Sequence, residues 1–280
     1  MNRFSAFAYD YVILKHKDYK PFPYLRHPDG DKEMYCVSPI HGRSFIVGRR
    51  DDGRYIISKG NGLSYSERTF LYTPEFGDDT WGLLLKQDAI RDFTVGDEIR
   101  ELGIKTNIME CVLELDCKIK LQNGSELKPI LLQYNVECPF RICDAPFMTR
   151  EQINKEVAKW EAMNDRGFKE KYMIAANVLI RNMRIMHDHG ILHNAIHNQN
   201  YTWALELLDF ELAHTPNYPY SREDYVRHVP MLMPREVIHT YEVINYIAGV
   251  LRERIYYSKT DALFNEYGYN VGNYNVYCCP

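Results

Sequence analysis

The feature that most constrains the fold is a change of pattern partway along the chain, from short strands that flank tight turns to long helices. Asp51-Asp52-Gly53 and Asn123-Gly124 each separate two β-rich runs. Asp-Gly and Asn-Gly are strong hairpin signals, because these residues adopt the left-handed backbone that tight turns require. The predicted strands around the two turns are residues 45–49, 54–59, 108–121 and 127–136.

One helix interrupts these strands, and helices follow them. Residues 86–103 carry apolar side chains at helical spacing and end at Gly103, a residue type that favours helix C-termini. Pro139 and Pro146 then break the pattern, and Thr149 is a candidate N-cap because its hydroxyl can accept from the first N–H groups of a helix. The helices expected after it are residues 150–164, 169–189 and 234–257.

The order of these segments predicts an α+β chain in two parts. Residues 1–138 hold an irregular lead-in, a β-sheet and one helix, whereas residues 139–280 are mostly helical and include a polar hairpin. A chain of 280 residues is long enough for two such lobes. This is the order of a bilobal, protein kinase-like fold with a β-rich N-lobe, one key helix and a mostly helical C-lobe.

Composition narrows the class of protein. Hydrophobic residues make up 45% of the chain and charged residues 26%, as in soluble globular proteins. The net charge of −4 argues against non-specific binding to nucleic acid or to a membrane surface. The seven cysteines form no CxxC pair, and no signal peptide or membrane span is evident. We therefore expect a cytoplasmic protein whose partners include neither nucleic acid nor membrane.

Residues 187–213 carry the clearest candidate for chemistry. An apolar helix end leads into a polar loop with Asn200, and the apolar run 203–208 then delivers Asp209. An Asn and an Asp nine residues apart, joined by a hairpin, can both reach one divalent cation beside a phosphate chain, an arrangement that protein kinases use. The alternative is a buried hairpin with polar turn residues.

Lys59 is the second candidate. It ends a predicted strand, from which its ammonium group can neutralise phosphate charge. The Gly60-Asn61-Gly62 segment follows at once, and the next helix carries Asp97 and Glu98, either of which can pair with Lys59 and hold it in place. The alternative for Lys59 is a solvated lysine at a strand end, and for the two carboxylates it is ordinary surface charge.

Three stretches resemble the selenoprotein O family of protein kinase-like AMP transferases. ISKGNGLSYSER is similar to that family's lysine segment LKGAGxTPYSR, and RDFTVGDEIRELGIKT is similar to REFxxSEAMxxLGIPT. GILHNAIHNQNYTWALELLDFE resembles GFxHGVMNTDNMSxxxxTIDYG without a gap. The three stretches occur in the family's order across residues 45–250.

The resemblance implies a kinase fold that binds ATP with Mg²⁺ or Mn²⁺ and transfers AMP to a Tyr, Ser or Thr side chain of a protein partner. It places the metal ligands on Asn200 and Asp209, and the helix carboxylate that pairs with the lysine on Asp97. In this family an arginine near the lobe junction contacts the phosphates. The implied cofactor-binding residues are Lys59, Gly60, Gly62 and Arg141.

The chain departs from the family's pattern where the base is expected. Gln199 stands at the position of the family's Asp, and Gln can orient a hydroxyl group but cannot take its proton. We count Gln199 with Lys59 and Asp97 as candidate catalytic residues, and His197 and His189 are alternative bases. Glu211 replaces a kinase glycine two residues after the metal-binding Asp. Three interpretations stay open: AMP transfer, a nucleotide-binding pseudoenzyme that serves as a scaffold, and ordinary phosphotransfer.

Overall fold

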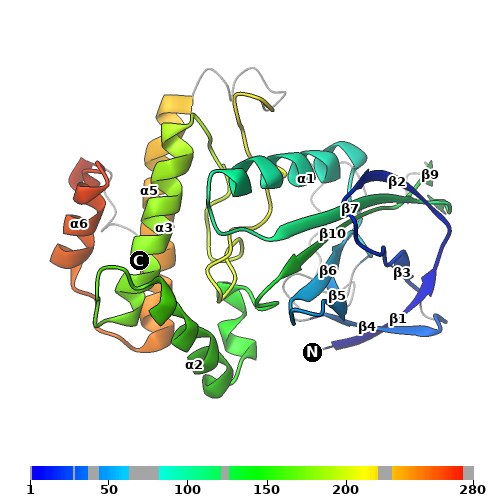
Figure 1. Cartoon of the computed structure of the whole chain (residues 1–280), viewed down its shortest axis with the longest axis horizontal. Coiled ribbons are helices and arrows are strands. Elements are labelled where there is room, and N and C mark those ends of the chain that lie inside the picture. The colour runs from blue at the N-terminus through cyan, green and yellow to red at the C-terminus, as the bar shows by residue number, and fades with distance from the viewer. Residues whose placement is uncertain are drawn as a thin grey trace. The chain divides into compact units, whose positions relative to one another are not determined.

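The chain divides into two compact units, which we call the sheet unit and the helical unit. In this computed structural model the described residues are 2–27, 29–36, 44–62, 82–120, 126–219 and 229–273. The sheet unit contains Met1–Asp97 and Asn107–Pro139, and the helical unit contains Glu98–Thr106 and Phe140–Pro280. Figure 1 shows strands in the first unit and mostly helices in the second. The predicted α+β class, β-rich with one helix and then mostly helical, is confirmed.

An antiparallel sheet of eight strands forms the sheet unit, in the order β2-β7-β10-β6-β5-β4-β1-β3 (Figure 1). Its strands are β1 (Asn2–Ala8), β2 (Tyr11–His16), β3 (Tyr24–Arg26), β4 (Lys32–Cys36), β5 (Ser44–Arg49), β6 (Tyr55–Lys59), β7 (Ile108–Leu115) and β10 (Ile130–Val136). A separate pair, β8 (Ile119–Lys120) and β9 (Glu126–Leu127), is also antiparallel. Among the described residues, two clusters of buried side chains contribute to its hydrophobic core, one including Leu113 and Leu131 and one including Met34 and Phe45.

The first predicted hairpin is present as β5 and β6. Gly53 takes a φ of +86°, the left-handed backbone that glycine accommodates without strain. The Asp52 carboxylate accepts a hydrogen bond from the Arg54 backbone N–H at 3.0 Å, which stabilises the turn. Asn123 and Gly124 lie outside the described residues, but β8 and β9 on either side of them pair as a hairpin requires.

Helix α1 (Lys86–Glu101) follows β6 and lies within the predicted range of 86–103. Ala89, Phe93 and Ile99 on this helix are buried, as the helical spacing of its apolar residues indicates. The helix stops before Gly103, whose φ is +81°. The boundary between the two units falls inside α1, after Asp97.

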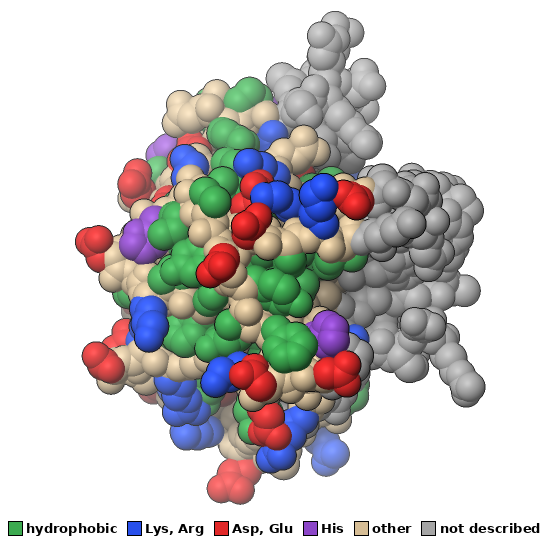
Figure 2. Space-filling model, turned by 90° about the vertical axis from the view of Figure 1, so that its right-hand side faces the viewer, with side chains coloured by type: hydrophobic (Ala, Val, Ile, Leu, Met, Phe, Trp, Pro, Cys, Tyr) green, Lys and Arg blue, Asp and Glu red, His purple; other side chains and the backbone are tan. Residues whose placement is uncertain are grey.

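One edge of the sheet exposes apolar side chains. The edge strand β2 presents Tyr11, Val12 and Ile13 to solvent. Figure 2 views the molecule from the side on which β1, β2 and β3 lie in Figure 1, and it shows hydrophobic side chains gathered among charged ones. The β2–β7 register shifts between Ile13 and Lys15. Such a bulge, followed by a lysine, disfavours pairing with a further strand.

The helical unit begins with a 3₁₀ turn, η3 (Ile142–Phe147), and continues through α-helices (Figure 1). Thr149 is the N-cap of α2, as predicted, because its hydroxyl accepts from the Gln152 N–H at 3.2 Å while the Gln152 side chain accepts from the Thr149 N–H. The remaining elements are α2 (Arg150–Lys159), η4 (Trp160–Met163), α3 (Lys171–Asp188), α5 (Val229–Leu251), α6 (Tyr257–Glu266) and η5 (Val271–Asn273).

The bounds of α5 differ from the predicted 234–257. The helix starts earlier and includes Pro234, and it ends at Leu251 because Arg252 takes a φ of +59°. No glycine marks that position, so the sequence carried no stop signal there. Among the described residues, no helix is long and apolar enough to cross a bilayer.

Candidate functional site

The polar loop predicted to carry metal ligands is a closed structure within the helical unit. Leu192 and His214 exchange both backbone hydrogen bonds, at 3.0 and 2.8 Å, and so clamp its two ends together. Inside this clamp, the Leu208 N–H donates to the Asn200 carbonyl at 2.9 Å, and the Thr202 N–H donates to the Glu206 carbonyl at 3.0 Å. The predicted hairpin is therefore present.

This hairpin places Asn200 and Asp209 at its open end. Asn200 is paired with Leu208, and Asp209 is the next residue along the chain. Leu205 at the closed end has a φ of +59° and Asp209 a φ of +69°. Backbone in this region is uncommon for residues other than glycine, and it aims the Asp209 side chain differently from an extended residue.

The Asn200 amide is held on both sides. Its Nδ2 donates to the Ala195 carbonyl at 3.0 Å, and its Oδ1 accepts from Arg141 Nη1 at 3.4 Å. The residue is buried. Because Nδ2 is committed to a carbonyl, Oδ1 is the atom turned toward Arg141, and an amide oxygen with a second lone pair is a suitable ligand for Mg²⁺.

Arg141 lies directly against this loop. Its Nη1 also donates to the Gln199 carbonyl at 2.8 Å. The backbone next to it continues the contact, since the Ile142 N–H donates to the Tyr201 carbonyl at 2.8 Å. The Arg141 N–H in turn donates to the Asp144 carboxylate at 2.8 Å. The structure thus gives Arg141 a positioning contact with the loop, whereas a contact with phosphate remains a prediction.

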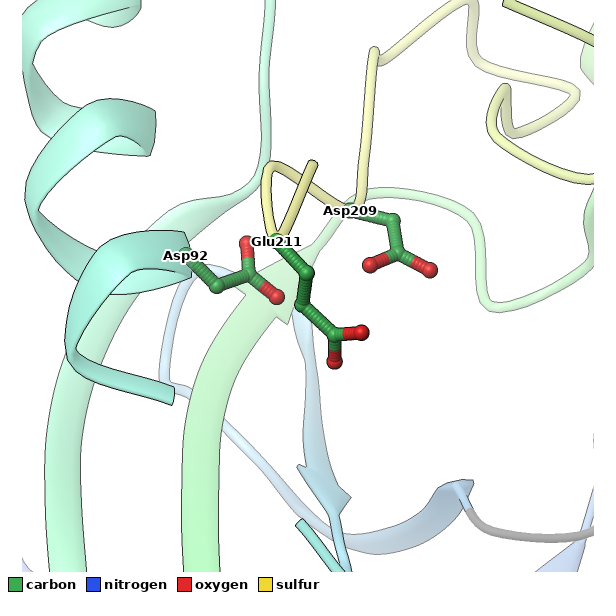
Figure 3. A group of neighbouring side chains, drawn as sticks. All are labelled: Asp92, Asp209 and Glu211. Atoms are coloured by element: carbon green, nitrogen blue, oxygen red, sulfur yellow. The ribbon is translucent and has the colours of Figure 1, made fainter. Parts of the chain in front are cut away.

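Glu211 adds a carboxylate that the sequence did not suggest as a ligand. Its carboxylate oxygen and that of Asp209 lie within 4.8 Å of each other, and Figure 3 shows both side chains leaving one turn toward the same side. Carboxylate oxygens are the type of ligand that Mg²⁺ and Mn²⁺ prefer. The sequence did carry a signal, because Glu211 follows Asp209 by only two residues. We interpreted Glu211 only as the replacement of a kinase glycine.

Two buried contacts anchor the start of the loop. His193 Nε2 contacts the Leu208 carbonyl at 2.9 Å, and burial lowers the pKa of His193, so the neutral ring donates from Nε2. Asn194 has a φ of +63°, and its N–H donates to Glu236 Oε1 at 2.6 Å. The other oxygen of Glu236 contacts His187 Nε2 at 2.8 Å, and His187 Nδ1 contacts the Tyr269 hydroxyl at 2.7 Å.

Neither Gln199, at the family's base position, nor His197 has the properties of a base. The Gln199 side chain is exposed and has no basic atom. The Gln199 N–H donates to His197 Nδ1 at 3.2 Å. Burial lowers the pKa of His197, so the ring is neutral with its proton on Nε2. The only lone pair on the His197 ring is therefore already used.

In the sheet unit, Lys59 forms a buried ion pair with a residue that we did not predict. Its Nζ lies 3.0 Å from Asp92 Oδ2, and both side chains are 2% exposed. Asp92 projects from α1 (Figure 3), so the expected pairing of the lysine with a carboxylate on this helix is present. The expected residue was wrong, because Asp97 instead pairs with Lys17 at 2.6 Å.

Helix geometry explains this correction. Asp97 lies five positions after Asp92. This offset places their side chains about 140° apart around an α-helix. Asp92 lies beside Phe93 and one turn after Ala89, on the buried face of α1. The spacing of these apolar residues in the sequence is the signal that could have identified Asp92 as the partner of Lys59. Glu98, the other predicted partner, accepts instead from the Thr215 hydroxyl at 2.8 Å.

The two glycines predicted to contact the cofactor both adopt a left-handed backbone conformation. Gly60 and Gly62 take φ values of +97° and +94°. A Cβ on Gly60 would lie 2.3 Å from the Ile130 carbonyl oxygen, so glycine is required there for close packing on β10. Their contact with a cofactor stays a prediction, and residues 63–81 lie outside the described part of the chain.

Comparison with known proteins identifies no family. No protein-family model and no curated protein matches the sequence. Among solved structures, a Toxoplasma gondii specific rhoptry antigen kinase domain is similar with 10% identity and a TM-score of 0.41, over 86% of this chain and 76% of that one. A Stt7 homolog from Micromonas algae, soaked with ATP, is similar with 11% identity and a TM-score of 0.42, over 81% of this chain and 79% of that one. Similarities of this size carry no argument about function.

Proposed function

We propose that this protein binds ATP together with Mg²⁺ or Mn²⁺ and transfers AMP to hydroxyl side chains of a protein partner. Asn200 and Asp209 hold the cation in this proposal, and Lys59 neutralises phosphate charge. Arg141 positions the loop and faces the phosphates. A chain with these roles has the working parts of a kinase-like protein.

The observation that carries the proposal is the hairpin at residues 200–209. It brings an amide oxygen and a carboxylate to one end of a clamped loop, with an arginine in contact with the amide. A second carboxylate, on Glu211, lies close to that of Asp209. Oxygen donors of this kind beside a guanidinium group suit a divalent cation that accompanies a phosphate chain.

The buried ion pair in the sheet unit gives independent support. A lysine on a strand, paired with a carboxylate on the next helix, is the arrangement that kinases use to hold the lysine that contacts the ATP phosphates. Lys59 on β6 and Asp92 on α1 form such a pair. A buried ion pair loses much of its Coulomb energy to desolvation, so stability alone is a weak reason for one to be present.

Phosphoryl and nucleotidyl transfer depend mainly on positioning and charge neutralisation, so activity does not require a strong base. The specific observation that favours a second candidate is the absence of a basic atom on the exposed Gln199, together with the occupied lone pair of His197. That candidate is a nucleotide-binding protein without turnover, which serves as a scaffold.

Radiolabelled ATP separates these outcomes. The protein is incubated with Mn²⁺ or Mg²⁺, a mixture of candidate acceptor proteins, and ATP labelled at the α- or the γ-phosphate. Label transferred to protein only from α-labelled ATP supports AMP transfer, and label only from γ-labelled ATP supports a kinase. A metal-dependent thermal shift with ATP but no label supports the scaffold. The matched variants are Asp209→Ala, which is expected to abolish the signal, and Glu151→Gln, an exposed carboxylate on α2 that is expected to keep it.

A further inference from the structure

A pocket of about 460 Å³ opens in the helical unit beside the loop that carries Asn200. His197 and Asn198 of this loop form one wall, and α5 forms another. The volume falls in the usual range for small-ligand sites, roughly 300–1,000 Å³. No role proposed above uses this pocket.

The lining of this pocket carries an acidic side chain. Glu242 on α5 is exposed, and none of the described residues forms an ion pair with it. The described lining contains this carboxylate and two histidines, His197 and His239, but neither lysine nor arginine. On the loop wall, His197 Nδ1 accepts a hydrogen bond from the Gln199 N–H at 3.2 Å, so this nitrogen carries no proton. An anionic ligand would therefore meet the Glu242 carboxylate, with no lysine or arginine in the described lining to offset it.

The remaining lining residues suit a cation with an apolar stem. Tyr257, which is half-exposed, and Tyr246 on α5 both line the pocket. The faces of tyrosine rings attract Lys and Arg side chains. Burial, with a further contribution from Cys143 and Asp144, raises the pKa of Tyr246 and keeps its hydroxyl protonated. Val243 and Ile255 supply apolar surface for methylene groups.

A buried hydrogen-bond acceptor, Asn245 Oδ1, also favours a ligand that carries donors. Asn245 lines the pocket, and its Oδ1 is buried with no hydrogen-bond partner among the described residues. Buried acceptors are nearly always paired in folded proteins, so such an atom calls for a donor. Guanidinium and ammonium groups carry only donors.

We propose that this pocket binds a lysine or arginine side chain of the protein substrate, with Glu242 as its ion-pair partner. The inference rests on the proposed function, because it names the class of substrate that this loop accepts. Asn198 in the pocket wall precedes Asn200 by two residues. A substrate segment that seats a basic side chain here therefore runs past the loop that carries the predicted metal ligand.

Peptide binding without nucleotide tests this proposal. The probes are fluorescein-labelled decapeptides with a shared Gly-Ser-Tyr background and a central Arg, Lys, Leu or Glu, titrated with the full chain and followed by fluorescence polarisation. The Arg and Lys peptides are expected to bind more tightly than the Leu and Glu peptides. Glu242→Gln is expected to reduce this preference about two- to fivefold, the range for a partly exposed ion pair, and the control Glu151→Gln to leave it unchanged.

Equal affinity for all four peptides, tighter binding of the Glu peptide, or a preference that survives in Glu242→Gln would each overturn the proposal. Circular dichroism and thermal melting show that each variant is folded before its titration counts. Because the assay contains neither ATP nor metal, its failure leaves the proposed nucleotide chemistry untouched. A failure of the labelling experiment, conversely, leaves a measured peptide preference intact.

Discussion

Lys59 in the sheet unit and Asn200 in the helical unit are both buried, and they are held by different means. The lysine is paired with one carboxylate, Asp92, at 3.0 Å. The asparagine sits in a loop clamped by backbone hydrogen bonds, with an amide–carbonyl bond on one side and Arg141 on the other. The first arrangement depends on one pair of opposite charges, and the second depends on several hydrogen bonds, most of them between backbone groups.

This difference decides how each region responds to a substitution. Removal of one partner from a buried ion pair leaves a charge without compensation, so the energetic cost falls on a single residue. Removal of one side chain from a hydrogen-bonded loop leaves most of the backbone contacts in place. The sheet unit is therefore expected to be the more sensitive at its candidate residue. Four predictions test the comparison.

The largest effect is expected at the ion pair. Asp92→Asn removes the carboxylate that lies 3.0 Å from the buried Lys59 ammonium, and the free energy of unfolding should fall by about 3–5 kcal/mol. Urea unfolding measures this. The double variant Lys59→Met with Asp92→Leu removes both charges and should recover most of the loss, since apolar replacements of buried pairs are often neutral. If the double variant is less stable than Asp92→Asn, the pair is not the cause.

The anchor of the loop should respond less. Glu236→Leu removes the acceptor of the Asn194 N–H and of His187, and an unsatisfied buried donor costs roughly 1–3 kcal/mol. Urea unfolding again gives the value. Tyr269→Phe, which removes only the hydroxyl contact with His187 Nδ1, is the milder control. A loss for Glu236→Leu that exceeds that for Asp92→Asn would reverse the comparison.

Acidification should weaken the helical unit in particular. Burial lowers the pKa of His193 and of His197 below the usual 6.5. Below about pH 6.5 the unfolded chain therefore binds more protons than the folded chain, and the free energy of unfolding falls as pH falls. One such group contributes at most about 1.4 kcal/mol per pH unit. Unfolding at pH 7.0, 6.0 and 5.0 gives the slope.

His193→Gln tests the origin of that slope, because glutamine can still donate toward the Leu208 carbonyl but does not titrate. The variant should show a shallower dependence on pH than the native chain, whatever its absolute stability. An unchanged slope would assign the pH dependence to other groups.

The smallest effect is expected at Arg141. Arg141→Lys keeps the charge but cannot reproduce a guanidinium that contacts both the Gln199 carbonyl and Asn200 Oδ1. Loss of one such bond should cost about 1 kcal/mol in the free energy of unfolding. A thermal-shift series with Mn²⁺ and ATP then shows whether the arginine also contributes to binding. A destabilisation larger than that of Glu236→Leu would mean that Arg141 stabilises the helical unit by more than these two hydrogen bonds.

Much of the fold followed from local signals. The β5–β6 hairpin, helix α1 and the Thr149 N-cap each lie where turn chemistry, apolar spacing or a capping residue places them. These signals act over a few residues, so they can be read without knowledge of the rest of the chain. The end of α5 was missed because Arg252 adopts a left-handed backbone that is more typical of glycine.

The partner of Lys59 shows the limit of motif matching. A resemblance of sequence placed the carboxylate on Asp97, whereas the buried face of α1 carries Asp92. A carboxylate on α1 does pair with Lys59, as predicted, but the predicted residue was wrong. Matching residue types along a motif takes no account of which residues of the helix face the protein interior. Glu211 was missed for a related reason, since it was compared with the residue it replaces and not with its neighbour Asp209.

The sequence by itself determined the α+β class, the hairpin that carries Asn200 and Asp209, and the type of atoms available for a cation. Tertiary structure decided which carboxylate meets Lys59, how Arg141 holds Asn200, and which imidazole lone pair is already used. The physical reason is the separation along the chain over which each interaction acts. Turns and helices are set by backbone preferences of adjacent residues, whereas ion pairs and hydrogen bonds between distant side chains depend on how the elements pack.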